Sequence, residues 1–161
     1  MKIEIICIGG LKEPWLKGAE GEYKKRLSPY VKVNVTEISE KRLAKNPSPA
    51  DEEIVRESEG KAILHSAGKH NGACLIALDM RGKRFSSEGF AKKIDELALS
   101  GKSTLVFLIG GSLGLSEEVR NNADIVISFS DMTFPHQMMR VILLEQLYRA
   151  QKILRGEQYH K

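Results

Sequence analysis

The chain has 161 residues, 42% of them hydrophobic and 29% charged, with a net charge of +4. This length suits one domain with a sizeable core and does not suit two. No apolar run approaches the roughly 20 residues of a membrane span, and the short apolar start does not have the form of a signal peptide, so we expect a cytoplasmic protein. The modest excess of positive charge is compatible with a polyanionic partner but does not establish one.

Short apolar runs alternate with helix-like stretches along the chain. We expect strands at 3–8, 31–36, 74–80, 104–109 and 123–129. We expect helices at about 14–27, 52–67, 87–100, 116–122 and 136–155. The segment 40–51 contains Pro47 and Pro49 and is expected to form a surface loop, with Asp51 capping the helix that follows. This alternation predicts an α/β fold, with a parallel sheet and helices on both faces.

The two cysteines, Cys7 and Cys74, both lie inside apolar runs. They form no CxxC pair and have no histidine at ligand spacing, so we expect buried thiols without a metal or redox role. The chain also has no Walker-type GxxxxGK[ST], no GxGxxG after its first strand, and no HExxH or GxSxG. Dinucleotide-dependent, metal-dependent and serine hydrolase chemistry are therefore disfavoured, and no metal is expected.

Ligands of parallel sheets bind beyond the carboxyl ends of the strands, which directs attention to the loops after 79, 109 and 129. Gly110 and Gly111 directly follow a buried strand. Glycine here either permits a tight turn or lets backbone amides approach a flat ligand. The loop 129–134 leaves a neighbouring strand at the same end of the sheet, which favours the second interpretation. We therefore expect Gly110→Val to abolish ligand binding because its side chain would occupy the ligand's place.

The final helix is apolar on more than one face. A first stripe consists of Met139, Leu143, Leu147, Ala150 and Leu154, and a second of Met138, Ile142 and Ile153. A helix with several apolar faces is buried on several sides. In so short a chain, either a second subunit covers part of it or the monomer buries it completely.

At the end of the chain the sequence becomes specific. FSDMTFPHQMMRVILLEQLYRAQKILRGEQYHK, together with LIGGSLGL and LIALDMRGKRFSSEGFA, closely resembles the RlmH (YbeA-like) family of SPOUT-class 23S ribosomal RNA methyltransferases. The resemblance extends from the opening MKIEIICIGGLKEPW to the closing YHK. It therefore covers the full chain and implies a single SPOUT methyltransferase domain over residues 1–161.

The resemblance implies a C-terminal trefoil knot, a homodimer with the final helix at its interface, and S-adenosyl-L-methionine as cofactor. The implied cofactor-binding residues are Leu78, Gly110, Phe129, Ser130, Asp131, Met132, Thr133 and Phe134. The implied reaction is methylation of N3 of pseudouridine 1915 in helix 69 of 23S ribosomal RNA, on the assembled ribosome. The competing hypothesis is a non-catalytic ribosome- or RNA-binding α/β protein, which saturable binding of S-adenosylmethionine would exclude.

Methylation of a weakly acidic N3–H needs a base or a group that stabilises the developing anion. The candidate catalytic residues are His136, Arg140, Tyr159 and His160. We expect Arg140 to hold a phosphate or a carbonyl oxygen, and Tyr159 and His160 to act on the substrate side, reaching into the partner's site. As alternatives, His136 only caps its helix and the tail only becomes ordered on RNA. The residues Lys24, Lys25, Arg26 and Lys32 are candidates for contacts with RNA.

Overall fold

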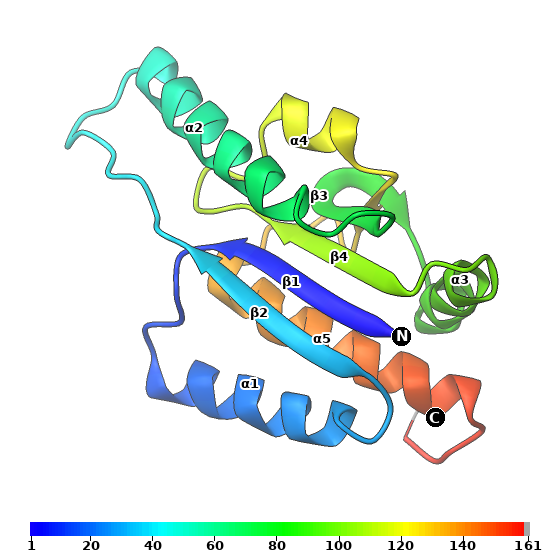
Figure 1. The fold of residues 1–161 in the computed structure, drawn as a ribbon. Helices are drawn as coiled ribbons and strands as arrows, with labels where there is room; N and C mark the ends of the chain where they lie inside the picture. Colours follow the sequence, from blue (N-terminus) through cyan, green and yellow to red (C-terminus); the bar gives the residue numbers. More distant parts are fainter. Residues whose placement is uncertain (160–161) are drawn as a thin grey trace.

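A five-stranded parallel sheet forms the centre of the molecule in the computed structural model, which describes residues 1–159 (Figure 1). Its strands are β1 (Lys2–Ile8), β2 (Lys32–Ile38), β3 (Cys74–Arg84), β4 (Thr104–Ile109) and β5 (Ile125–Ser128), in the spatial order β2-β1-β4-β3-β5. The helices are α1 (Pro14–Leu27), α2 (Pro49–Ala67), α3 (Ser87–Leu99), α4 (Glu117–Asn122) and α5 (His136–Leu154). The predicted α/β fold with a parallel sheet is confirmed.

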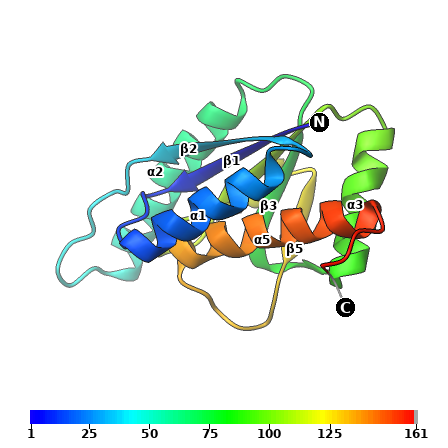
Figure 2. The same cartoon turned by 90° about the horizontal axis from the view of Figure 1, so that it is seen from below.

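Helices cover both faces of the sheet, as predicted. In Figure 1, α2 and α4 lie above the sheet and α1 and α5 below it, and Figure 2 shows α5 running between α1 and α3. The molecule has two hydrophobic cores, one on each face of the sheet. Strand β1 contributes to both, because successive side chains of a strand point to opposite faces. Ile3 and Ile5 pack into the core under α1, α3 and α5, whereas Ile6 and Ile8 pack into the core under α2 and α4.

The interior strands β1 and β4 are the most completely buried. All residues from Leu105 to Ile109 are buried, as the unbroken apolar run predicts for a strand covered on both faces. Both cysteines are buried too, and burial raises the pKa of the Cys7 thiol to about 11, which keeps it protonated. The expectation of inert core thiols agrees with this placement.

The start of α2 differs from the prediction. The helix begins at Pro49, and Ser48 is its N-cap: the Ser48 hydroxyl accepts from the Asp51 N–H, and the Asp51 carboxylate accepts from the Ser48 N–H. Asp51 is therefore the third helical residue of a capping box and does not cap the helix. Proline suits the first turn, where its missing N–H breaks no helical hydrogen bond, so Pro49 opens the helix instead of excluding it.

The strand β3 is longer than predicted and irregular. Its pairing with β5 shifts register between Leu78 and Lys83, so that both residues face Ile127. Gly82 lies so close to β5 that a Cβ there would approach the Ile127 carbonyl carbon to 2.5 Å. The residues between the two registers are displaced toward the carboxyl edge of the sheet. The trefoil knot implied by the resemblance stays a prediction. Within residues 1–159, no helix has the length and apolar character needed to cross a membrane.

Candidate cofactor site

A cavity of about 500 Å³ opens at the carboxyl ends of β3, β4 and β5. This is the edge at which parallel sheets bind ligands. Three chain segments and the start of α5 form most of its wall: Leu78, Asp79, Met80 and Arg81; Ile109, Gly110, Gly111, Leu113, Gly114 and Leu115; Ile127, Ser128, Phe129, Ser130, Met132, Thr133 and Phe134; and His136 and Met139. Residues of α2 and α4 complete it: Glu53, Arg56, Glu117 and Arg120.

The structure brings seven of the eight candidate cofactor residues to this cavity. Leu78, Gly110, Phe129, Ser130, Met132, Thr133 and Phe134 all line it. Asp131 does not: its carboxylate is exposed and forms an ion pair with Arg84 on β3. The loop that carries residues 129–135 joins β5 to α5 and projects from the body of the molecule in Figure 2.

The glycine loop after β4 is a tight backbone turn. The Gly114 N–H donates to the Gly111 carbonyl at 3.0 Å, and Gly114 has a φ of +77°, which favours glycine. A Cβ on Gly110 would lie 2.5 Å from the Gly114 carbonyl carbon and 2.8 Å from the Leu115 nitrogen. The reason given for Gly110→Val therefore needs correction, because a side chain there collides first with the protein's own backbone and not with a ligand.

His136 is the first residue of α5 and faces the cavity. The N-cap of α5 is Pro135, so the alternative that His136 caps its helix does not describe this structure. The Nε2 atom of His136 is buried and has no hydrogen-bond partner among the described residues. It lies 3.6 Å from where a Cβ of Gly9 would stand. The residue lines the cavity, whereas its Nε2 atom is shielded from solvent and lies near Gly9 at the end of β1.

Arg140 lies outside the cavity, contrary to the role proposed from the sequence. It is 2% exposed, and its Nη1 donates to Glu20 at 2.9 Å and to Glu37 at 2.6 Å, while its Nη2 donates to the Gly9 carbonyl at 2.9 Å. The guanidinium thus joins α5 to α1, β2 and the end of β1. Because both terminal nitrogens are engaged, Arg140 is not available to hold phosphate in this conformation.

Tyr159 packs back against the second half of α5. Its hydroxyl donates to Glu145 at 3.1 Å, and its ring packs edge-on against Tyr148, with the ring centroids 4.8 Å apart. Burial, followed by contact with Tyr23 and Glu145, raises the pKa of the Tyr159 hydroxyl. Glu145 follows His136 by nine positions, about 14 Å along the helix, and Tyr159 does not line the cavity of its own protomer. His160 lies outside the described residues.

The sequence did not single out Asp79 and Arg120, which face the cavity together. Arg120 Nη1 lies 3.4 Å from Asp79 Oδ2 and also donates to the Leu115 carbonyl. The Arg81 N–H donates to Asp79 Oδ1 at 3.0 Å. Asp79 could have been selected from the sequence as a site residue, because it is the first polar residue after an apolar run that forms a strand. Arg120 had none, because it reaches the cavity from a short helix more than 40 positions along the chain.

Fold and cavity together define an α/β protein with a candidate ligand site beyond the carboxyl ends of a parallel sheet. A family model described as "Predicted SPOUT methyltransferase" matches residues 1–160. Proteins named Ribosomal RNA large subunit methyltransferase H are 54% identical in Clostridium novyi (strain NT) and 52% identical in Carboxydothermus hydrogenoformans, with both chains covered completely. The chain therefore belongs to the SPOUT methyltransferase family, which confirms the resemblance seen in the sequence.

Solved structures support the fold at low sequence identity. A probable methylase family protein from Haemophilus influenzae Rd KW20 is similar with a TM-score of 0.56 at 12% identity, over 99% of this chain and 70% of that one. A putative methylase family protein from Neisseria gonorrhoeae has a TM-score of 0.50 at 13% identity, over 91% of this chain and 81% of that one. At such identities the likeness concerns the fold alone.

Proposed function

We propose that this chain is an S-adenosylmethionine-dependent methyltransferase of large-subunit ribosomal RNA. Family membership and the names of the full-length relatives support this activity. The observation that carries the cofactor assignment is the cavity: two backbone loops and the buried, unpartnered His136 nitrogen converge at the edge of the sheet where ligands bind.

The residues of the cavity fit S-adenosylmethionine. A volume of about 500 Å³ falls within the roughly 300–1,000 Å³ of small-molecule sites. Leu78, Ile109 and Leu115 offer an apolar surface for a purine ring, and the backbone of the loops 110–114 and 128–134 offers hydrogen-bonding groups for its edge. Asp79 and Arg120 offer one anion and one cation for the polar parts of the molecule.

The finer proposal concerns the reaction: methylation of N3 of pseudouridine 1915 in helix 69 of 23S ribosomal RNA. S-adenosylmethionine supplies a methyl group already activated on a sulfonium centre, so the protein's contribution is mainly to position the reactants. The N3 proton must leave as the methyl group arrives. His136 is the candidate base of the same protomer, because it lines the cavity and its Nε2 has no hydrogen-bond partner among the described residues.

The tail enters this proposal through a homodimer. Tyr159 does not line the cavity of its own protomer, so it and His160 would act in the cavity of a second copy. Met138 and Ile142 remain half-buried on α5, although Leu143, Leu144 and Leu147 are fully buried within the protomer. The apolar helix is thus covered on most sides by α1, α3 and the sheet, and the remaining apolar surface is the candidate dimer contact.

Two measurements test the function. Calorimetric titration with S-adenosylmethionine should give saturable binding, whereas a non-catalytic RNA-binding protein would give none. Mass mapping of 23S ribosomal RNA from cells that lack the protein should reveal one missing methyl group, restored when purified protein and cofactor are added to the ribosomes. If the protein binds S-adenosylmethionine saturably but cells that lack the protein show an unchanged methylation map, the cofactor assignment stands and the proposed substrate is excluded.

A further inference from the structure

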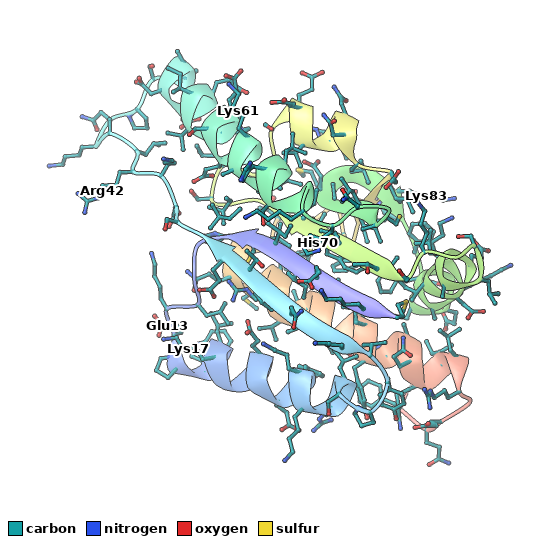
Figure 3. All side chains as sticks on the ribbon, viewed as in Figure 1. Glu13, Lys17, Arg42, Lys61, His70 and Lys83 are labelled. Carbon is teal, nitrogen blue, oxygen red and sulfur yellow. The ribbon has the colours of Figure 1, made fainter. Side chains whose placement is uncertain are left out.

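The loop between β2 and α2, residues 39–48, carries exposed positive charge at the carboxyl edge of the sheet. Lys41, Arg42 and Lys45 are all exposed, and Arg42 and Lys45 form no ion pair within residues 1–159. Figure 3 shows Arg42 at the same end of the molecule as Lys17, which stands near the start of α1. Among the described residues, Arg42 and Lys45 thus have no ion-pair partner, and their charges are available to an external polyanion.

This loop lies next to the candidate cofactor site. Residues 40–43 line a second, smaller cavity of about 250 Å³ together with Val55 and Glu59 of α2 and with Ser112 and Leu113. Leu113 also lines the main cavity. The two cavities therefore adjoin each other at Leu113 of the glycine loop.

The helix α2 holds both loops. Glu59 is 4% exposed, and its Oε1 accepts from the Lys41 N–H at 3.0 Å; its Oε2 lies 3.0 Å from where a Cβ on Gly111 would stand. Arg56 Nε, one turn earlier, donates to the Leu113 carbonyl at 3.0 Å. Burial raises the pKa of Glu59, so its carboxylate is held there at a cost. The contacts make the basic loop and the glycine loop parts of one attached unit.

The basic residues selected from the sequence lie elsewhere. Lys24 and Arg26 pair with Glu20 and Glu22 one turn before them, which neutralises their charge. They stand at the end of α1, whose 14 residues span about 21 Å, and Lys32 begins β2 at the amino edge of the sheet. An RNA bound there would lie across the molecule from the cavity of the same protomer, so the geometry does not bring these residues to that cavity.

We propose that the substrate RNA docks through its phosphates on the loop segment from Lys41 to Lys45. Glu59 is a positioning residue that attaches this segment to the glycine loop after β4. This docking surface rests on the proposed function, because it is the surface through which the methyltransferase would bind its RNA substrate. Each cation that neutralises a phosphate contributes about one unit to the slope of log affinity against log salt. The segment therefore contributes up to about three units.

The test compares two double variants with the same change in charge. Arg42→Glu with Lys45→Glu alters the segment, and Lys25→Glu with Lys32→Glu alters the opposite edge. With ribosomes from cells lacking the protein as substrate, the first variant should raise KM for ribosomes at least about tenfold and lower the salt slope. Its kcat and its affinity for S-adenosylmethionine should stay unchanged, and the second variant should stay within about twofold of the wild type.

Three outcomes would overturn the docking surface. These are an unchanged KM in the first variant, equal losses in both variants, or weaker binding to ribosomes with unchanged binding to protein-free 23S ribosomal RNA, which would assign the surface to a ribosomal protein. If the wild type transfers no methyl group at all, the proposed function fails instead, so the two failures are distinguishable.

Glu59 is tested by rescue. Glu59→Ala removes the acceptor of the Lys41 N–H and should raise KM for ribosomes several-fold, although Glu59 touches no RNA in the proposal. Glu59→Gln keeps an acceptor oxygen and should restore most of the wild-type KM. Equal effects of alanine and glutamine, or no effect of alanine, would remove Glu59 from the proposal.

Discussion

Substitution of Gly110 by alanine tests whether the glycine loop forms the cofactor wall. The new Cβ would lie 2.5 Å from the Gly114 carbonyl carbon, 2.6 Å from its oxygen and 2.8 Å from the Leu115 nitrogen, all of them backbone atoms. Non-bonded carbon atoms prefer about 3.5 Å, so the loop must move by about 1 Å. A displacement of that size can cost on the order of 100-fold in a positioned site.

The assay is calorimetric titration of Gly110→Ala with S-adenosylmethionine, alongside urea unfolding. We expect the affinity to fall about 100-fold and the free energy of unfolding to fall by about 1–3 kcal/mol, the usual cost of overpacking. The control is Gly21→Ala in α1, where a Cβ meets nothing within 4 Å. It should leave the affinity unchanged and stabilise the helix by about 0.5–1 kcal/mol.

A wild-type affinity in Gly110→Ala would refute this reasoning. Either the loop would have moved without consequence, so that it is not the cofactor wall, or it would have absorbed the Cβ without moving. A crystal structure of the variant separates these two cases. A loss of stability with unchanged affinity would keep the steric argument and reject the assignment of the loop.

Three further predictions concern other parts of the molecule. Arg140→Met should lower the free energy of unfolding by about 1–3 kcal/mol in urea, because it leaves the buried Gly9 carbonyl and the partly buried Glu20 without their donor, with a much smaller effect on cofactor affinity. An unchanged stability would contradict the role of Arg140 in joining α5 to α1, β2 and β1. Deletion of residues 159–161 should suppress methyl transfer to ribosomes while calorimetry finds cofactor affinity nearly intact, and equal losses in both would reject the proposed division of labour. Burial raises the pKa of Glu59 above its ordinary 4.5, so its ionisation costs stability progressively as pH rises above about 4.5. Glu59→Gln should therefore lose less stability than the wild type as the pH rises from about 4.5 in urea unfolding, and parallel curves would show that Glu59 does not titrate as described.

The order and type of the elements could be predicted because local patterns determine them. Pro14 and Ser28 bound the first helix in the sequence, and α1 runs from Pro14 to Leu27. The start of α2 was predicted wrongly because two prolines were interpreted as helix breakers. Only the capping box between Ser48 and Asp51 distinguishes a proline that opens a helix from one that ends it.

The site could be predicted only as far as the fold places strand ends together. Leu78, Gly110 and the loop 129–134 follow three strands whose carboxyl ends share one edge, so the topology alone brings them close. Arg140 was misplaced because its partners, Glu20 and Glu37, are more than 100 positions away. The sequence shows that Arg140 is charged, but it does not show which distant carboxylates will pair with it in the folded protein.

The capping box of α2 and the Glu59 contact together leave a free span of chain between two attachment points. Lys41 is attached at one end and Ser48 at the other, while residues 44–46 are exposed. Loop length is thermodynamically inexpensive where the ends are already held, since doubling a loop costs only about 0.6 kcal/mol. A peptide inserted in this span should therefore cost the fold little, yet it would stand on the proposed RNA-docking segment and should block ribosome binding without unfolding the protein.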